Sequence, residues 1–217
     1  DWFDTEVWNA SYRTEIGNIG LSIQVYGSDI DHGMSNSLLR PTPNFSNLSL
    51  PPFVGDDNRA ALTASEESGF KVTFDWAVSN GTMLAGIEGK DAQHDATVYD
   101  PDFPPFSVNN FNGSYVENLA IFGQWSSSVG QRAYLEAGFR SENVDMSTET
   151  VDAFPARLVD MNPAMWAMGT PPRAVFMLRE GFNAADRSQT DNNLDWVVKG
   201  RYQATDNLVV ELGFAQK

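Results

Sequence analysis

Short and long connections alternate strictly along the chain, between segments in which apolar and polar residues also alternate. The short connections are tight turns at residues 16–19, 79–82, 128–131 and 204–207. The long connections, rich in Pro, Asn, Ser and Asp, span about residues 35–62, 99–115 and 147–192. This segregation by length is typical of transmembrane β-barrels, in which turns are tight on one side of the bilayer and extended on the other.

The segments between these connections predict β-strands. Residues 70–78 and 194–202 alternate apolar with mostly polar positions, and residues 133–140 and 208–215 give two further examples. A period of two over eight or nine residues indicates a strand with one apolar face. Weaker strands are predicted at about residues 3–15, 20–34, 82–98 and 116–127. The chain therefore predicts an all-β fold of eight antiparallel strands, and no segment shows helical periodicity.

Composition removes several classes of function. The chain has 29 acidic and 14 basic residues, a formal charge of −15, which argues against nucleic-acid binding because that needs a basic surface. Cysteine is absent, which excludes disulfides, zinc–thiolate sites and a thiol nucleophile. No run approaches the ~18 apolar residues of a transmembrane helix. Transmembrane strands stay compatible with this composition, because every second residue faces a wet lumen.

Four aromatic residues each precede a short turn by a few positions. They are Tyr12, Trp76, Trp125 and Tyr202. Aromatic rings at that level form the girdles that border the apolar band of a transmembrane barrel. The alternative is that they are ordinary core aromatics of a soluble sheet.

The direction of the strands predicts an internal piece of a larger barrel. If the short turns are periplasmic, the first strand runs inward and the eighth runs outward, so both chain ends lie outside. Complete single-chain barrels start and finish in the periplasm, and residues 216–217 lack a closing aromatic. An eight-strand piece has two unpaired edges, which need the rest of the barrel in lipid. We therefore expect an open, strongly curved sheet.

Two stretches resemble TonB-dependent outer-membrane receptors, specifically the copper-receptor branch. Residues 31–40 read Asp-His-Gly-Met-Ser-Asn-Ser-Leu-Leu-Arg, similar to the Asp-His-x-Met-x-Asn-x-x-Leu-Arg run where a barrel strand enters an extracellular loop. Residues 201–215 resemble a late barrel hairpin of such receptors. The resemblance implies that residues 1–217 are part of a receptor β-barrel domain in the outer membrane of a Gram-negative bacterium. It also implies a partner, TonB, acting through a plug and TonB box outside this chain.

The resemblance implies that His32 and Met34 are metal ligands, joined by Cys and Met from the plug. Gly33 and Ser35 stand where bulkier or acidic neighbours are expected. The pair is chemically coherent, because residues two apart on a strand share a face. Imidazole and thioether suit copper, especially Cu(I), and not Mg or Ca. The alternative is a strand-end pair that contacts loop residues. Copper would be a transported ligand, and no permanently bound cofactor is predicted.

Other candidate residues gather toward the long connections. Six of the seven methionines do so, as a vestibule of soft ligands or as apolar packing over the mouth: Met34, Met146, Met161, Met165, Met168 and Met177. Acidic residues there concentrate cations or form a solvated surface: Asp56, Asp57, Asp100, Asp102, Glu149, Asp152 and Asp160. His94 is interpreted as a surface polar residue.

The chain carries no enzyme motif: Gly-x-Ser-x-Gly, His-Glu-x-x-His and a phosphate loop are all absent. We therefore predict that it is not an enzyme. The function predicted is uptake of a scarce ligand, copper above all, by a TonB-dependent receptor. Two alternatives stay open: a receptor for a siderophore or another ligand, and a structural or adhesive barrel without transport.

Overall fold

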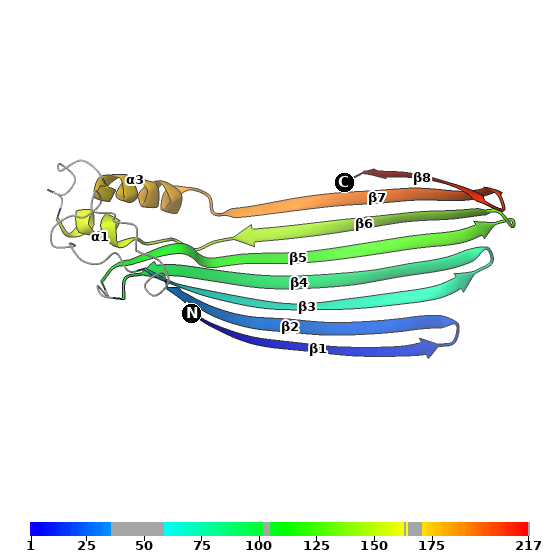
Figure 1. Cartoon of the computed structure of the whole chain (residues 1–217), viewed down its shortest axis with the longest axis horizontal. Helices are drawn as coiled ribbons and strands as arrows, with labels where there is room; N and C mark the ends of the chain where they lie inside the picture. The colour runs from blue at the N-terminus through cyan, green and yellow to red at the C-terminus, as the bar shows by residue number, and fades with distance from the viewer. Residues whose placement is uncertain (36–58, 102–104, 163, 165–170, 217) are drawn as a thin grey trace.

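Eight antiparallel strands form one sheet in the order of the sequence, as predicted (Figure 1). The computed structural model describes residues 1–35, 59–101, 105–162, 164 and 171–216. The strands are β1 (Trp2–Ile16), β2 (Ile19–Ser35), β3 (Ala60–Val78), β4 (Gly81–Tyr99), β5 (Ser107–Val129), β6 (Ala133–Ser147), β7 (Ser188–Thr205) and β8 (Leu208–Gln216). β1 and β8 are the two edges and do not pair with each other, so the sheet is open.

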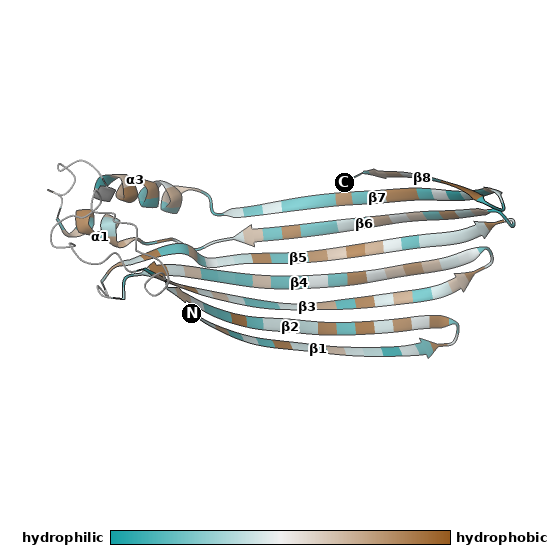
Figure 2. Cartoon of the chain, in the orientation of Figure 1, coloured by the Kyte–Doolittle hydropathy of each residue, from teal (hydrophilic) through white to brown (hydrophobic). Residues whose placement is uncertain are grey.

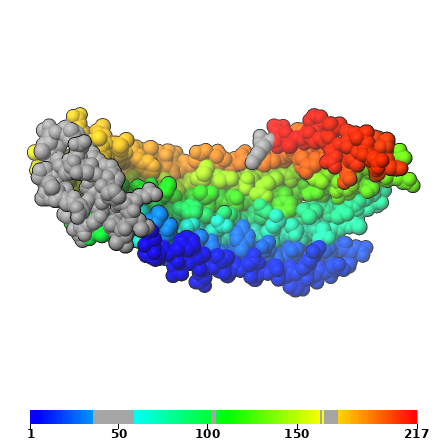
Figure 3. All heavy atoms as spheres, in the orientation of Figure 1, coloured from blue at the N-terminus to red at the C-terminus, as the bar shows by residue number. Residues whose placement is uncertain are grey.

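The sheet is a single layer, and each strand packs against its sequence neighbours, so the colours run in order across the space-filling view (Figure 3). All four short turns lie at one end, which we call the short-turn end (Figure 1). The strand ends that border the long connections, and the N-terminus, lie at the opposite end, which we call the long-connection end (Figure 1). No helix among the described residues is long and apolar enough to cross a bilayer.

Two helices correct the prediction that no segment is helical. They are α1 (Phe154–Met161) and α3 (Pro171–Ala184), and both lie beyond the strands at the long-connection end (Figure 1). Both fall in the segment predicted as the loop 147–192.

The long connections are also shorter than predicted. The strands leave residues 36–59, 100–106 and 148–187 between them, in place of 35–62, 99–115 and 147–192. The extra strand residues lie toward the long-connection end, where neither face of the sheet is continuously apolar. The alternation of apolar and polar residues therefore did not predict these strand residues, although the hydrogen bonds between strands continue through them.

The two faces of the sheet differ sharply near the short-turn end. One face, here called the band face, carries rows of apolar side chains that pair across strands, for example Ile23, Val72, Ile87 and Ile121. Figure 2 shows the resulting alternation of brown and paler residues along the strands. On β3 the apolar positions run from Phe70 to Val78, roughly 30 Å along the strand and roughly 24 Å when the strand is tilted. An apolar band of that height fits the hydrocarbon core that a transmembrane barrel must cross.

Four aromatic residues predicted to border this band all lie on the band face. Met83 of β4 lies between two of them, because it pairs with Trp76 on β3 and with Trp125 on β5. Tyr12 pairs with Ile23, and Tyr202 pairs with Val210. Their shared face and their closeness to the short turns agree with the predicted aromatic girdle.

Successive hairpins are staggered by a nearly constant amount. The first residue of β2, Ile19, pairs with Trp76, so the β3–β4 hairpin extends two residues further toward the short-turn end. The β5–β6 hairpin extends two residues beyond the β3–β4 hairpin, and the β7–β8 hairpin extends three residues beyond the β5–β6 hairpin. Two residues of stagger over two strand spacings correspond to a strand tilt of about 35°. This is the tilt that closure into a barrel requires.

Aromatic rings cover glycines on neighbouring strands. A Cβ added to Gly27 would lie 2.6 Å from the Trp8 ring, and one added to Gly89 would lie 2.6 Å from the Phe70 ring. Gly86 is more constrained, because its Cβ would lie 2.4 Å from Phe122 and 2.5 Å from the carbonyl oxygen of Val72. Side chains can move aside, but a backbone carbonyl in a ladder cannot do so without breaking the pairing.

We expect Gly86→Ala to destabilise the folded protein by about 1–3 kcal/mol, the range for overpacking a close-packed site. Gly138→Ala is the matched control on the same face, because the atom nearest to its Cβ lies 3.4 Å away. Urea unfolding of the full-length protein, followed by tryptophan fluorescence, compares the two variants. Equal midpoints for both would contradict the close approach at Gly86.

Candidate functional site

His32 lies on β2 near the long-connection end, on the face opposite the band face. Its ring stands edge-on to the Phe3 ring of β1, with 5.3 Å between ring centroids. Phe3 and Thr63 are its partners on the two neighbouring strands, and the Thr63 hydroxyl donates to the His32 carbonyl oxygen at 3.4 Å. His32 is half-buried.

Met34 shares that face, two residues further along β2, as the spacing predicted. It pairs with Ala61 of β3, and 43% of its surface is exposed. Among the described residues, no three His, Cys, Asp or Glu side chains gather closely enough to hold a metal ion. Within the described part of the chain, His32 and Met34 thus share a face of β2 without such a cluster around them.

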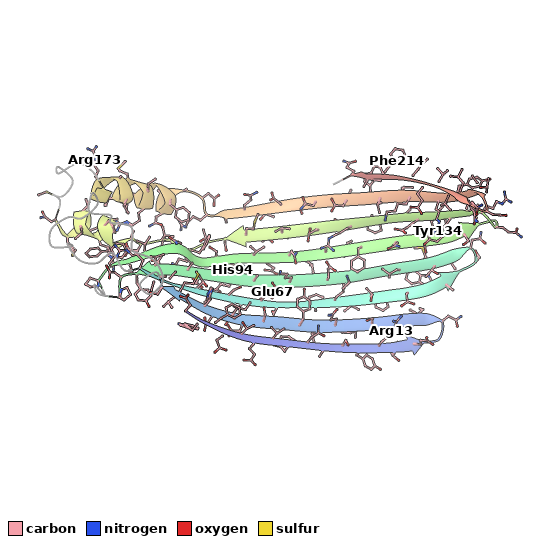
Figure 4. All side chains as sticks on the ribbon, viewed as in Figure 1. Arg13, Glu67, His94, Tyr134, Arg173 and Phe214 are labelled. Carbon is pink, nitrogen blue, oxygen red and sulfur yellow. The ribbon has the colours of Figure 1, made fainter. Side chains whose placement is uncertain are left out.

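The other methionines are spread over several elements. Met146 is half-buried on β6, whereas Met161 of α1 and Met177 of α3 are 69% and 54% exposed. Met165 and Met168 lie outside the described residues, as do Asp56, Asp57 and Asp102. His94 is exposed on the half of β4 toward the long-connection end (Figure 4).

The face opposite the band face carries the ion pairs of the sheet, and we call it the ion-pair face. At its centre Arg140 of β6 donates to Glu88 at 2.5 Å and to Glu142 at 2.8 Å. Lys71 pairs with the second oxygen of Glu88 at 3.0 Å, and Asn118 donates to Glu142 at 3.1 Å. The sequence showed these residues as polar positions of strands, but only the register brings four strands into one network.

Carboxylates occupy the band face beyond the apolar band. Asp29 faces Glu66 across strands, and Asp91 faces Glu117. Every Lys and Arg of the eight described strands lies on the ion-pair face, so no basic side chain of a described strand offsets these like-charge pairs. Directly opposed like charges are destabilising in a sheet and are tolerated best in water. The acidic rows thus mark the border above which the band face is solvated.

The two helices form a packed cap at the long-connection end. Phe154, Ala156 and Val159 of α1 are buried there. Arg179 of α3 donates to both carboxylate oxygens of Asp160, at 2.7 and 2.9 Å. These hydrogen bonds from the guanidinium hold the pKa of the Asp160 carboxyl below its ordinary value.

The cap is fastened to the strands by polar contacts. Arg157 of α1 donates to the Ser107 hydroxyl at 2.8 Å, at the start of β5. Asn183 of α3 exchanges two hydrogen bonds of 2.9 Å with the backbone of Val151. The acidic residues Asp152 and Asp160 are therefore bound in ion pairs with Arg179 rather than free to capture cations.

An open antiparallel sheet with an apolar band, staggered hairpins and a charged opposite face is the fold of part of a transmembrane β-barrel. No protein-family model matches the sequence, and no curated protein matches it either. Solved structures do match. The copper transporter OprC superposes with a TM-score of 0.67 at 16% identity, over 98% of this chain and 31% of that chain.

The ferric-catecholate import receptor Fiu from E. coli K12, in its closed form, superposes with a TM-score of 0.51 at 13% identity. That match covers 97% of this chain and 32% of the receptor, so this chain spans about a third of the length of each neighbour. These likenesses confirm the predicted fold, a partial antiparallel β-barrel. Both neighbours are named for transport or import, in agreement with the prediction that the chain is not an enzyme.

Proposed function

We propose that this chain is the barrel portion of a TonB-dependent outer-membrane receptor that takes up copper. The observation that carries the proposal is the shared face of His32 and Met34, at the long-connection end of β2. An imidazole nitrogen and a thioether sulfur there present a neutral, soft donor pair to whatever fills the barrel, and such a pair selects Cu(I) over hard cations.

The neighbouring residues favour copper over an anionic chelate. A ferric catecholate complex carries negative charge and needs basic side chains to bind it. Around His32, the partners on the ion-pair face are Phe3, Thr63 and Ala96, which are all uncharged. In this proposal the outer membrane is the location, the apolar band contacts its lipid, and a plug with a TonB box supplies further ligands and the link to TonB.

The test is copper binding by the full-length receptor with His32→Ala and Met34→Ala combined. We expect the affinity for Cu(I), measured by competition with a chelator of known affinity, to fall about 100-fold, because even supporting residues of metal sites contribute 10–100-fold. Ile30→Ala, on the same strand and face, is the control and should bind as the wild type does. Unchanged affinity in the double variant would overturn the copper proposal and leave a receptor for another ligand.

A further inference from the structure

Three soft-donor residues occupy the same position on three alternate strands of the sheet. His32, His94 and Met146 each stand 13 residues beyond the first residue of their strand, which is Ile19, Gly81 or Ala133. They lie on β2, β4 and β6, the strands that run away from the short turns. The chain contains only two histidines, and both take this position.

The three side chains also share a face. His32 pairs with Thr63, which pairs with Ala96, so His32 and the even-numbered residues of β4, His94 among them, lie on the ion-pair face. Ala92 of β4 pairs with Val116, and Val116 pairs with Met146, which places Met146 on that face too. Opposed residues of a ladder point to the same side, so the assignment follows from the register alone.

The stagger of the hairpins brings these positions to one height. Each hairpin begins about two residues further along than the one before it, which is the offset that tilted strands need to end at a common plane. Residues equally far from their short turns therefore lie at equal heights above that plane. His32, His94 and Met146 form an arc at one level on the ion-pair face, here called the soft-donor collar.

The direct cross-strand partners of the collar residues are uncharged, and the nearest carboxylates on this face, Glu67 and Asp191, lie two residues further along the neighbouring strands. On the strands that run the other way, the partners within each hairpin are Phe3 for His32, Ser65 for His94 and Val116 for Met146. His94 also pairs with Ser114 on its other side. His94 is exposed and Met146 is half-buried, so both donors remain reachable. The donors that the collar offers are soft nitrogen and sulfur atoms, which soft metal ions prefer to carboxylate oxygens.

We propose that the soft-donor collar is a set of weak sites for soft monovalent metal ions, which exchange with the site at His32 and Met34. This inference rests on the proposed function and extends it to His94 and Met146. Collar members sit two strands apart, roughly 10 Å or more. One ion cannot bridge them, because bonds from a metal to nitrogen or sulfur are only about 2.0–2.3 Å. Each donor thus holds an ion separately and briefly, which suits passage rather than storage.

The experiment measures Ag(I), a soft monovalent ion that undergoes no redox cycling, bound to the full-length receptor. Equilibrium dialysis over a wide range of free ion should show a tight phase and a weak phase. We expect His94→Ala combined with Met146→Ala to remove about two ions from the weak phase and to leave the tight phase unchanged. Gln93→Ala combined with Asp145→Asn is the matched control, because these exposed neighbours lie on the opposite face.

The outcomes separate the collar from the proposed function. A weak phase that persists in the His94/Met146 variant, or that the control variant loses equally, overturns the collar. A tight phase that survives loss of His32 and Met34, with the weak phase still dependent on His94 and Met146, overturns the proposed site and supports the collar. Uptake of Ag(I) by cells at low concentration should fall about 3- to 10-fold in the collar variant if exchange feeds the tight site.

Discussion

Ile87→Arg will destabilise the full-length protein in lipid by about 2–4 kcal/mol, the cost of a guanidinium on the lipid face of a barrel near the bilayer midplane. Ile87 lies on the band face of β4, flanked by Val72 on β3 and Ile121 on β5. An arginine there has no carboxylate within the row, and it is too far from the headgroups to reach water without distorting the bilayer.

The matched control is Gln93→Arg, six residues further along the same strand and on the same face. Gln93 is exposed and lies beyond the apolar band. Its direct cross-strand partners are Glu66 and Tyr115. A basic residue beside those acidic rows should cost about 0–1 kcal/mol. Urea unfolding in lipid vesicles measures both variants. Equal costs would show that the band face is not buried in lipid.

Arg140→Met is the second substitution with a large expected effect. It leaves Glu88 and Glu142 without their shared guanidinium, and both side chains are half-buried, with 27% and 18% of their surface exposed. Removing one partner of a fully buried ion pair costs about 3–5 kcal/mol, so we expect roughly 2–3 kcal/mol for this half-buried network. Lys71 remains beside Glu88 and limits the loss.

Arg201→Met is the control for Arg140→Met. Arg201 and Glu211 lie 3.5 Å apart with 60% and 69% of their side chains exposed, and such pairs contribute about 0–1 kcal/mol. The two variants remove the same charge from the same face, so only burial and network size differ. A cost for Arg201→Met as large as that for Arg140→Met would contradict the central role of the network.

The sequence predicted the elements that carry a periodic signal and missed those that do not. All eight strands were found because their short-turn halves alternate apolar and polar residues. Helix α3 was missed because its inward-facing positions include Arg179 and Asn183, which bind Asp160 and Val151, while Leu178 and Phe182 are exposed. Polar residues facing inward and apolar residues facing outward give the reverse of the usual amphipathic pattern.

The candidate site was predictable only within one strand. The spacing of His32 and Met34 was enough to place both on one face, because alternation along a strand is a local property. The contact between His32 and Phe3, and the level that His32 shares with His94 and Met146, depend on the register between strands. Register follows from turn geometry and from the burial of one whole face, which no single segment reveals.

The uniform stagger of the hairpins has a consequence for how barrels of this kind change size. Because each hairpin repeats nearly the same offset from the one before it, the tilt is a property of the repeating pair and not of the total number of strands. A hairpin inserted by duplication, or lost by deletion, would widen or narrow the cylinder while its neighbours kept their pitch. The diameter of the barrel can thus change during evolution in steps of two strands, while the tilt and pairing of the remaining strands are kept.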